Sequence, residues 1–143
     1  MRKFKFDRLF EPYEVDELIP RLEFLMRGLQ ENAQKFRKRF SELTQEQVSA
    51  PIQSFELDEL IRMDPELHEF AQQMAEFASQ IEACGGLLKD VDLGLVDFPA
   101  EIEGETVFLC WQFGEPRVSA WHPLDGGFSQ RRPLQGVRRS YLN

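Results

Sequence analysis

The feature that most constrains this chain is a long row of apolar residues in its first third. They follow one another at alternating spacings of four and three positions, as Val15, Ile19, Leu22, Met26, Leu29, Ala33, Phe36, Phe40 and Leu43. Such spacing places all of them on one face of an α-helix. It predicts one helix over residues 12–44, on the order of 45 Å long. Pro12 suits the first helical position, and the unbroken row around Pro20 predicts a kink there.

A second apolar row predicts a partner for this helix. Its members are Leu67, Phe70, Met74, Phe77, Ile81 and Cys84. Asp64 is the expected N-cap and Gly85 the expected stop. Joined by a connection over residues 44–56, the two helices should form a long antiparallel helical hairpin over about residues 12–84. The first helix is longer than its partner can cover, so we also expect a homo-oligomer formed through the hairpin, most simply a two-fold dimer.

The last third of the chain has the pattern of short strands. Turn sequences at Glu103-Gly104 and Gly114–Pro116 separate extended segments. They predict a small antiparallel β-meander over about residues 87–122, followed by an irregular tail over residues 123–143. Because the strands follow the helices and do not alternate with them, the predicted fold class is α+β, in a single domain of residues 1–143.

Charge and composition narrow the classes of partner. The 143 residues carry a net charge of −8, and residues 41–105 hold sixteen acids against two bases. Nucleic acid binding through the basic ends is therefore only a weak third hypothesis. We find neither a signal peptide nor an apolar run of membrane length, and expect a cytoplasmic protein with no membrane partner. Cys84 and Cys110 form no paired motif and are expected to be reduced thiols.

A series of short motifs resembles one known family. The motifs are LIP at 18–20, GGLLKD at 85–90, GLVDFPA at 94–100, LCW at 109–111, GEP at 114–116, WHP at 121–123 and Gly-Phe, Arg and Pro-Leu within 127–134. In this order, over nearly the whole chain, they resemble the bacterial domain-of-unknown-function family 2203. One departure is Glu11-Pro12, where the family usually has a small polar residue and then an acid. The resemblance implies a fold and a bacterial source, but no activity, because the family has none assigned.

Several polar residues in the last third are candidates for chemistry. The candidate catalytic residues are His122, Asp97 and Glu115, and the candidate ligand-binding residues are Trp121, Arg131, Arg132 and Asp125. A histidine with carboxylates can run acid–base chemistry or bind a metal, although no spacing here assigns a metal site. Structural roles compete: His122 as a local hydrogen-bonding group, Asp97 and Glu115 as turn residues, Cys110 as a small buried residue. An exposed Trp121 beside Arg132 would be able to stack a planar or anionic ligand.

Strand register decides which candidates can act together. If Gly114–Arg117 forms a tight turn, His122 pairs with Leu109 and faces the more apolar side of the sheet. With a two-residue turn at Glu103-Gly104, Asp97 lies opposite Cys110 on the other side. This simplest register separates His122 from Asp97. A one-residue bulge in the 99–105 connection would bring the two to one face.

Two functional hypotheses follow from the sequence. The first is an uncharacterised bacterial cytosolic protein that acts as an oligomeric interaction or ligand-binding module, with the Trp121–Arg132 segment binding a protein or small ligand. The alternative is a metal-assisted hydrolase, or another acid–base enzyme, that uses His122 with nearby carboxylates. Nothing in the sequence names a cofactor, a substrate or a protein partner.

Overall fold

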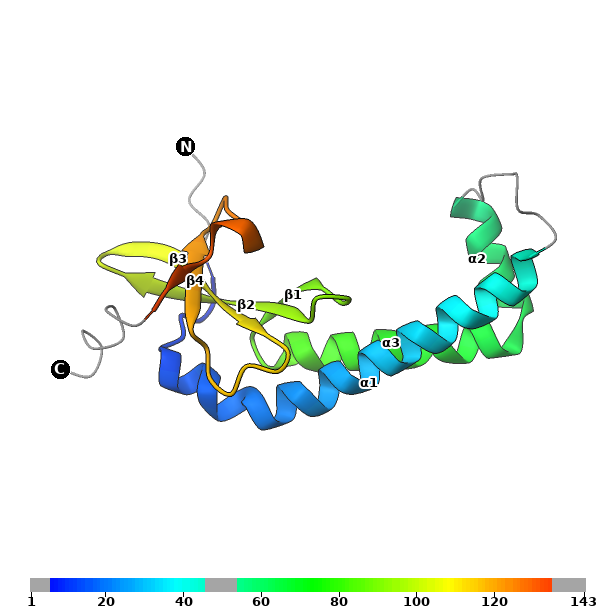
Figure 1. Cartoon of the computed structure of the whole chain (residues 1–143), viewed down its shortest axis with the longest axis horizontal. Coiled ribbons are helices and arrows are strands. Elements are labelled where there is room, and N and C mark those ends of the chain that lie inside the picture. The colour runs from blue at the N-terminus through cyan, green and yellow to red at the C-terminus, as the bar shows by residue number, and fades with distance from the viewer. Residues whose placement is uncertain (1–5, 46–53, 135–143) are drawn as a thin grey trace.

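The computed structural model describes residues 6–45 and 54–134 and has an α+β fold (Figure 1). The helices are α1 (Pro12–Thr44), α2 (Ser54–Met63) and α3 (Pro65–Ala83). The strands are β1 (Leu87–Asp90), β2 (Leu95–Ile102), β3 (Glu105–Gln112), β4 (Ala120–Pro123) and β5 (Arg132–Pro133), with a 3-10 helix, η2 (Phe128–Gln130), before β5. A long N-terminal helix followed by an antiparallel sheet confirms the predicted fold class.

Helix α1 begins at Pro12, as the sequence predicts. The backbone N–H of Glu11 donates to the Glu14 carboxylate at 2.9 Å, which caps the first turn and lowers the pKa of Glu14. The first part of the apolar row is buried, namely Val15, Ile19, Leu22, Met26, Leu29 and Ala33. The helix continues through Pro20, and the axis of α1 is bent in its first half (Figure 1), which agrees with the expected kink.

Helix α3 packs along α1 through contacts that run in opposite order in the two helices. Arg21 donates to the Gln80 side chain at 3.2 Å, and further along α1, Arg39 forms an ion pair with Asp64 at 2.6 Å. Asp64 is the N-cap of α3, as predicted, and accepts from the backbone N–H of Leu67. The bond from Arg39 and then the backbone bond lower the pKa of Asp64 to about 2.

The segment between α1 and α3 is partly helical. Leu57, Leu60 and Ile61 belong to α2, which begins at Ser54, so the end of the expected 44–56 connection is helix. Residues 46–53 of that connection lie outside the described residues. In Figure 1, α2 and the end of α1 lie away from the sheet. The strands therefore cover only the first part of the helical pair.

The strands form one antiparallel sheet in the sequential order β1-β2-β3-β4-β5. β2 and β3 pair regularly along their length, which confirms the turn predicted at Glu103-Gly104. Both turn residues have positive φ, 51° and 83°, as in a type I′ hairpin turn. One face of the sheet joins the apolar core with α1 through Val96, Phe98, Ala100, Val107, Leu109 and Trp111. The opposite face is therefore free to hold polar groups.

The prediction of an irregular tail is wrong for the residues that the structure describes. β5 pairs with β4, with Arg132 opposite Trp121, and η2 precedes it. The expected return strand over 117–122 is shorter at its start, because β4 begins at Ala120. Residues 135–143 of the predicted tail lie outside the described residues. The added strand lengthens the meander by one edge and carries the chain back across β4.

The predicted register between β3 and β4 is also wrong, by one residue. His122 pairs with Phe108 and not with Leu109. Since successive side chains of a strand point to opposite faces, this shift moves His122 from the helix side of the sheet to the other side.

The register changes because the connection between β3 and β4 is not a tight turn. The Phe113 N–H donates to the Gly94 carbonyl at 2.8 Å, and the Glu115 carboxylate accepts from the Gln112 N–H at 2.6 Å. The chain therefore leaves the ladder after β3, and pairing with β4 resumes only at Ala120.

Candidate functional site

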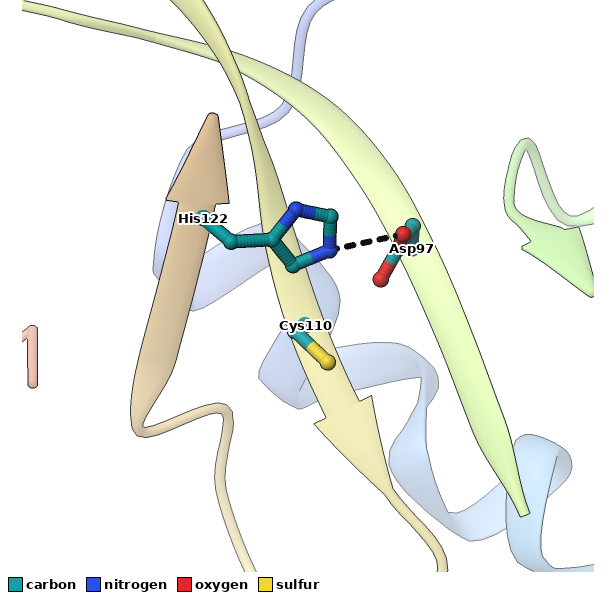
Figure 2. A group of neighbouring side chains, drawn as sticks. All are labelled: Asp97, Cys110 and His122. Atoms are coloured by element: carbon teal, nitrogen blue, oxygen red, sulfur yellow. Dashed lines mark hydrogen bonds and ion pairs between the residues drawn. The ribbon is translucent and has the colours of Figure 1, made fainter. Parts of the chain in front are cut away.

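Three chemically capable side chains meet on the sheet face that points away from the helices. Asp97 in β2, Cys110 in β3 and His122 in β4 come from adjacent strands, and Figure 2 shows their side chains close together. All three are buried, with exposed fractions of 2%, 1% and 2%. The predicted separation of His122 from Asp97 is therefore wrong. Its cause is the β3–β4 register and not a bulge between residues 99 and 105, where pairing is regular.

His122 is held at both ring nitrogens. Nδ1 lies 2.8 Å from the Pro123 carbonyl oxygen, and Nε2 lies 2.9 Å from Oδ2 of Asp97. Because a carbonyl oxygen only accepts, Nδ1 carries a proton. Nε2 faces the carboxylate, as an acceptor from protonated Asp97 or as a donor from the charged ring. The local hydrogen bond expected for His122 is confirmed, and the bond to Asp97 is additional.

Asp97 is a buried carboxyl group with spare bonding capacity. Its Oδ1 atom is buried and has no hydrogen-bond partner within the described part of the chain. Burial raises the pKa of Asp97, and the His122 ring acts against that rise. The expected turn-capping role is wrong, because Asp97 lies inside β2. A buried oxygen without a donor is uncommon in folded proteins and marks a place where a water or a cation binds.

Cys110 is a buried thiol in this structure. Burial and the nearby charge of Asp97 raise the pKa of Cys110 to about 12. Arg131, which donates to the Cys110 carbonyl oxygen at 3.1 Å, lowers this pKa only in part. The expectation of a small buried residue is confirmed. At neutral pH the sulfur becomes a thiolate only if a cation binds it directly.

A cavity of about 80 Å³ adjoins the three side chains. It is lined by Lys89, Leu95, Asp97, Cys110, His122, Gly126, Gly127 and Phe128. One ligand atom from each of Asp97, Cys110 and His122 lies within 4.8 Å of the other two. A set of one oxygen, one sulfur and one imidazole nitrogen suits zinc and related divalent transition metals.

Comparison with known proteins assigns the chain to a family. The family model described as "Uncharacterized conserved protein (DUF2203)" matches residues 8–134, which include every strand and the three clustered side chains. The chain belongs to this family. The match confirms the resemblance drawn from the sequence motifs. No curated protein and no solved structure matches the chain.

No helix in the described ranges of this DUF2203 chain has the length and hydropathy needed to cross a membrane.

Glu115 and Arg131 form a separate pair in this DUF2203 protein. One guanidinium nitrogen of Arg131 donates to both carboxylate oxygens of Glu115, at 2.9 and 3.1 Å. Glu115 also accepts from the Ser119 hydroxyl at 2.8 Å. Glu115 is therefore a brace of the β3–β4 connection and not the solvated turn residue expected from the sequence. Its carboxylate is already engaged and lies outside the cavity lining.

The remaining ligand-binding candidates do not join the cluster. Trp121 and Arg132 are cross-strand neighbours with the guanidinium 5.0 Å from the ring centroid, so their expected proximity is confirmed. Trp121 is half-buried and packs against the apolar core. Asp125 is exposed and is not part of the cavity lining. The structure therefore separates these residues from His122.

Sequence reasoning assigns neither Cys110 nor Lys89 to the site. A signal for Cys110 exists, because the turn at Glu103-Gly104 already predicts Cys110 opposite Asp97. Lys89 has no comparable signal. It sits at an irregularity in the β1–β2 pairing, between Leu88 and Asp90, and only the folded chain brings it to the cavity.

Proposed function

We propose that this DUF2203 chain binds a divalent transition-metal ion, with zinc the best fit, through Asp97, Cys110 and His122. The observation that carries the proposal is the convergence of three donor atoms within 4.8 Å of one another in a buried place. Three protein ligands with a further open position are typical of catalytic zinc sites. The adjoining cavity gives room at that position for a water or substrate. This arrangement supports the metal-assisted hydrolase of the two functional hypotheses.

The donor atoms need only small movements to fit such an ion. Around tetrahedral zinc, with bonds of about 2.0 Å to nitrogen or oxygen and about 2.3 Å to sulfur, ligand atoms lie roughly 3.3–3.6 Å apart. His122 Nε2 and Asp97 Oδ2 are 2.9 Å apart, so they would separate slightly. The unpartnered Oδ1 of Asp97 offers a second oxygen whose use breaks no hydrogen bond within the described residues.

The hydrogen bond from His122 to Pro123 also supports a ligand role. Metal-binding histidines usually donate their second ring N–H to a carbonyl or carboxylate oxygen, which fixes both the tautomer and the orientation of the ring. The 2.8 Å bond from Nδ1 to the Pro123 carbonyl does this and leaves Nε2 facing the cluster. When bound, zinc would supply a water with a pKa near 7, roughly the value needed for hydrolysis at neutral pH.

Cobalt(II) titration of the metal-stripped protein tests the proposal, because a thiolate bound to cobalt gives an intense near-ultraviolet charge-transfer band. The wild-type protein should develop this band and saturate at about one equivalent. Cys110→Ser should abolish the band, and His122→Ala should weaken binding at least about tenfold. Cys84→Ser is the matched control, because Cys84 caps α3 outside the cavity lining, and it should keep the band.

Two outcomes of this titration would refute the metal site. One is a wild-type protein that binds no cobalt. The other is a charge-transfer band that persists in Cys110→Ser, which would assign the thiolate ligand to another residue.

We also propose that the protein self-associates through α1 and α3, read as the arms of an antiparallel helical hairpin with coiled-coil spacing. The apolar row continues past the sheet, where Phe36 and Phe40 are only half-buried and their rings stack 6.4 Å apart. Met63, at the end of α2, is 74% exposed. A second copy related by a two-fold axis would cover these residues and form a four-helix arrangement. The free thiols of Cys84 and Cys110 fit a reducing compartment, which supports a bacterial cytosol.

Light scattering after size-exclusion chromatography tests the assembly. The wild-type chain should elute as a dimer at micromolar concentration, and Met63→Glu should shift it toward the monomer. Tyr13→Glu alters an equally exposed residue at the opposite end of α1 and should leave the dimer intact. A wild-type monomer throughout the concentration range would exclude this assembly.

A further inference from the structure

Lys89 connects the metal-binding candidates to a second, larger cavity. This cavity has a volume of about 300 Å³ and is lined by Phe6, Leu87, Lys89, Phe108 and Leu124. Lys89 also lines the small cavity that contains Asp97, Cys110 and His122. The Phe108 ring lies 5.6 Å from the His122 ring, so the two cavities are neighbours on one sheet face. A molecule in the larger cavity would therefore lie beside the candidate metal centre.

The larger cavity is apolar except for one cation. Four of its five lining side chains are hydrocarbon or aromatic. The Lys89 ammonium lies 4.9 Å from the Phe108 ring centroid, and no carboxylate among the described residues lies within ion-pair distance of it. The surface pair expected for a lysine next to Asp90 is not formed, since the Asp90 carboxylate caps the Leu93 N–H instead. The Lys89 ammonium is thus available to a ligand.

We infer that the larger cavity binds a small apolar carboxylate, with its hydrocarbon body against Phe6, Phe108 and Leu124 and its carboxylate on Lys89. The volume is in the range of small-molecule sites, and apolar walls with few polar groups are typical of them. As a substrate class, this inference rests on the proposed metal-assisted hydrolysis, because the ligand's polar end would lie next to the metal. The binding step itself involves Lys89 and the apolar walls alone.

The charge count favours a monoanion over a phosphate. A phosphate carries more charge and is usually met by several donors or by a guanidinium fork. The lining of the larger cavity supplies one ammonium group. Arg131, the nearest guanidinium to the cluster, is already bonded to Glu115 and to the Cys110 carbonyl. One lysine at the inner end of an apolar cavity matches one carboxylate.

Calorimetric titration with 2-naphthoate, in the presence of a chelator, tests this inference. The wild-type protein should bind the probe, and Lys89→Met should weaken binding at least about fivefold because the ion pair is lost while the hydrocarbon stem is kept. Lys35→Met changes an exposed lysine on α1 and should bind like the wild type. The uncharged 2-naphthamide should bind more weakly than 2-naphthoate to the wild type, and equally to Lys89→Met.

The outcomes separate this inference from the metal proposal. Cys110→Ser, which should not bind cobalt, should still bind 2-naphthoate; if it does so, failure of the cobalt test leaves the carboxylate site standing. Equal binding of 2-naphthoate by wild type and Lys89→Met would overturn the inference, as would equal binding of the acid and the amide by the wild type. No binding of either probe by the wild type would also overturn it.

Discussion

At the scale of single residues, the contact between His122 and Asp97 needs an energetic explanation. Both side chains are only 3% exposed, so each has lost the water that would solvate its charged form. A buried pair of this kind gives little net stability, but removal of one partner leaves the other buried and uncompensated. The additional unpartnered oxygen of Asp97 increases that penalty. A site kept at this cost fits a functional role better than a purely structural one.

The pair can be measured by a double-mutant cycle in the metal-free protein. His122→Ala should lower the free energy of unfolding by about 3 kcal/mol or more, because Asp97 is left without its partner. The variant Asp97→Ala with His122→Ala should lose less than the sum of the single changes, by about 1–3 kcal/mol. Urea unfolding in the presence of a chelator gives all four values. Strictly additive losses would show that the 2.9 Å contact carries no coupling.

The identity of the candidate residues was accessible from the sequence, but their grouping was not. The pairing of Asp97 with Cys110 follows from a turn signal in Glu103-Gly104, and it is correct. The position of His122 depends on a longer connection that no turn signal describes. The sequence analysis therefore found the right residues and separated two of them.

At the scale of elements, that connection is set by partners far away in the chain. The Val118 N–H donates to the Asp16 carboxylate of α1 at 2.8 Å, and Arg131 binds Glu115 from the segment before β5. These contacts hold residues 113–119 out of a tight hairpin. Local sequence preference predicts the turn between β2 and β3, where the two turn residues decide the geometry, and fails between β3 and β4, where tertiary contacts decide it.

The N-terminus of α3 gives a pH prediction. The pKa of Asp64 is lowered from 3.8 to about 2 in the folded protein, so its ionised form contributes stability above pH 3.8 that is lost as the pH falls toward 2. Asp64→Asn keeps an N-cap but removes the charge. Its unfolding free energy should therefore fall less than that of the wild type between pH 4 and about 2, as measured by urea unfolding across a pH series.

A control for this pH series is Asp92→Asn. Asp92 pairs with Arg37 on the surface, where both side chains are more than half exposed, so this change should leave the acid dependence close to that of the wild type. If Asp64→Asn and the wild type lose stability in parallel, the bond from Arg39 to Asp64 does not stabilise the start of α3.

At the scale of the whole molecule, the sheet divides two tasks. One face packs on the helices and forms the apolar core, and the other face carries Asp97, Cys110 and His122 beneath the segment that contains η2 (Figures 1 and 2). Helical periodicity and the order of the elements were enough to predict the α+β fold. They were not enough to predict β5 or the covering segment, because neither has a periodic apolar pattern and both depend on pairing with β4.

The central claim is that three strands place one oxygen, one sulfur and one nitrogen ligand around a single metal ion. X-ray absorption at the zinc edge of the zinc-loaded, dialysed protein tests it most directly. The account predicts one sulfur at about 2.3 Å together with nitrogen and oxygen at about 2.0 Å. A spectrum with only nitrogen and oxygen neighbours, or a protein that loses all its zinc on dialysis, would contradict it.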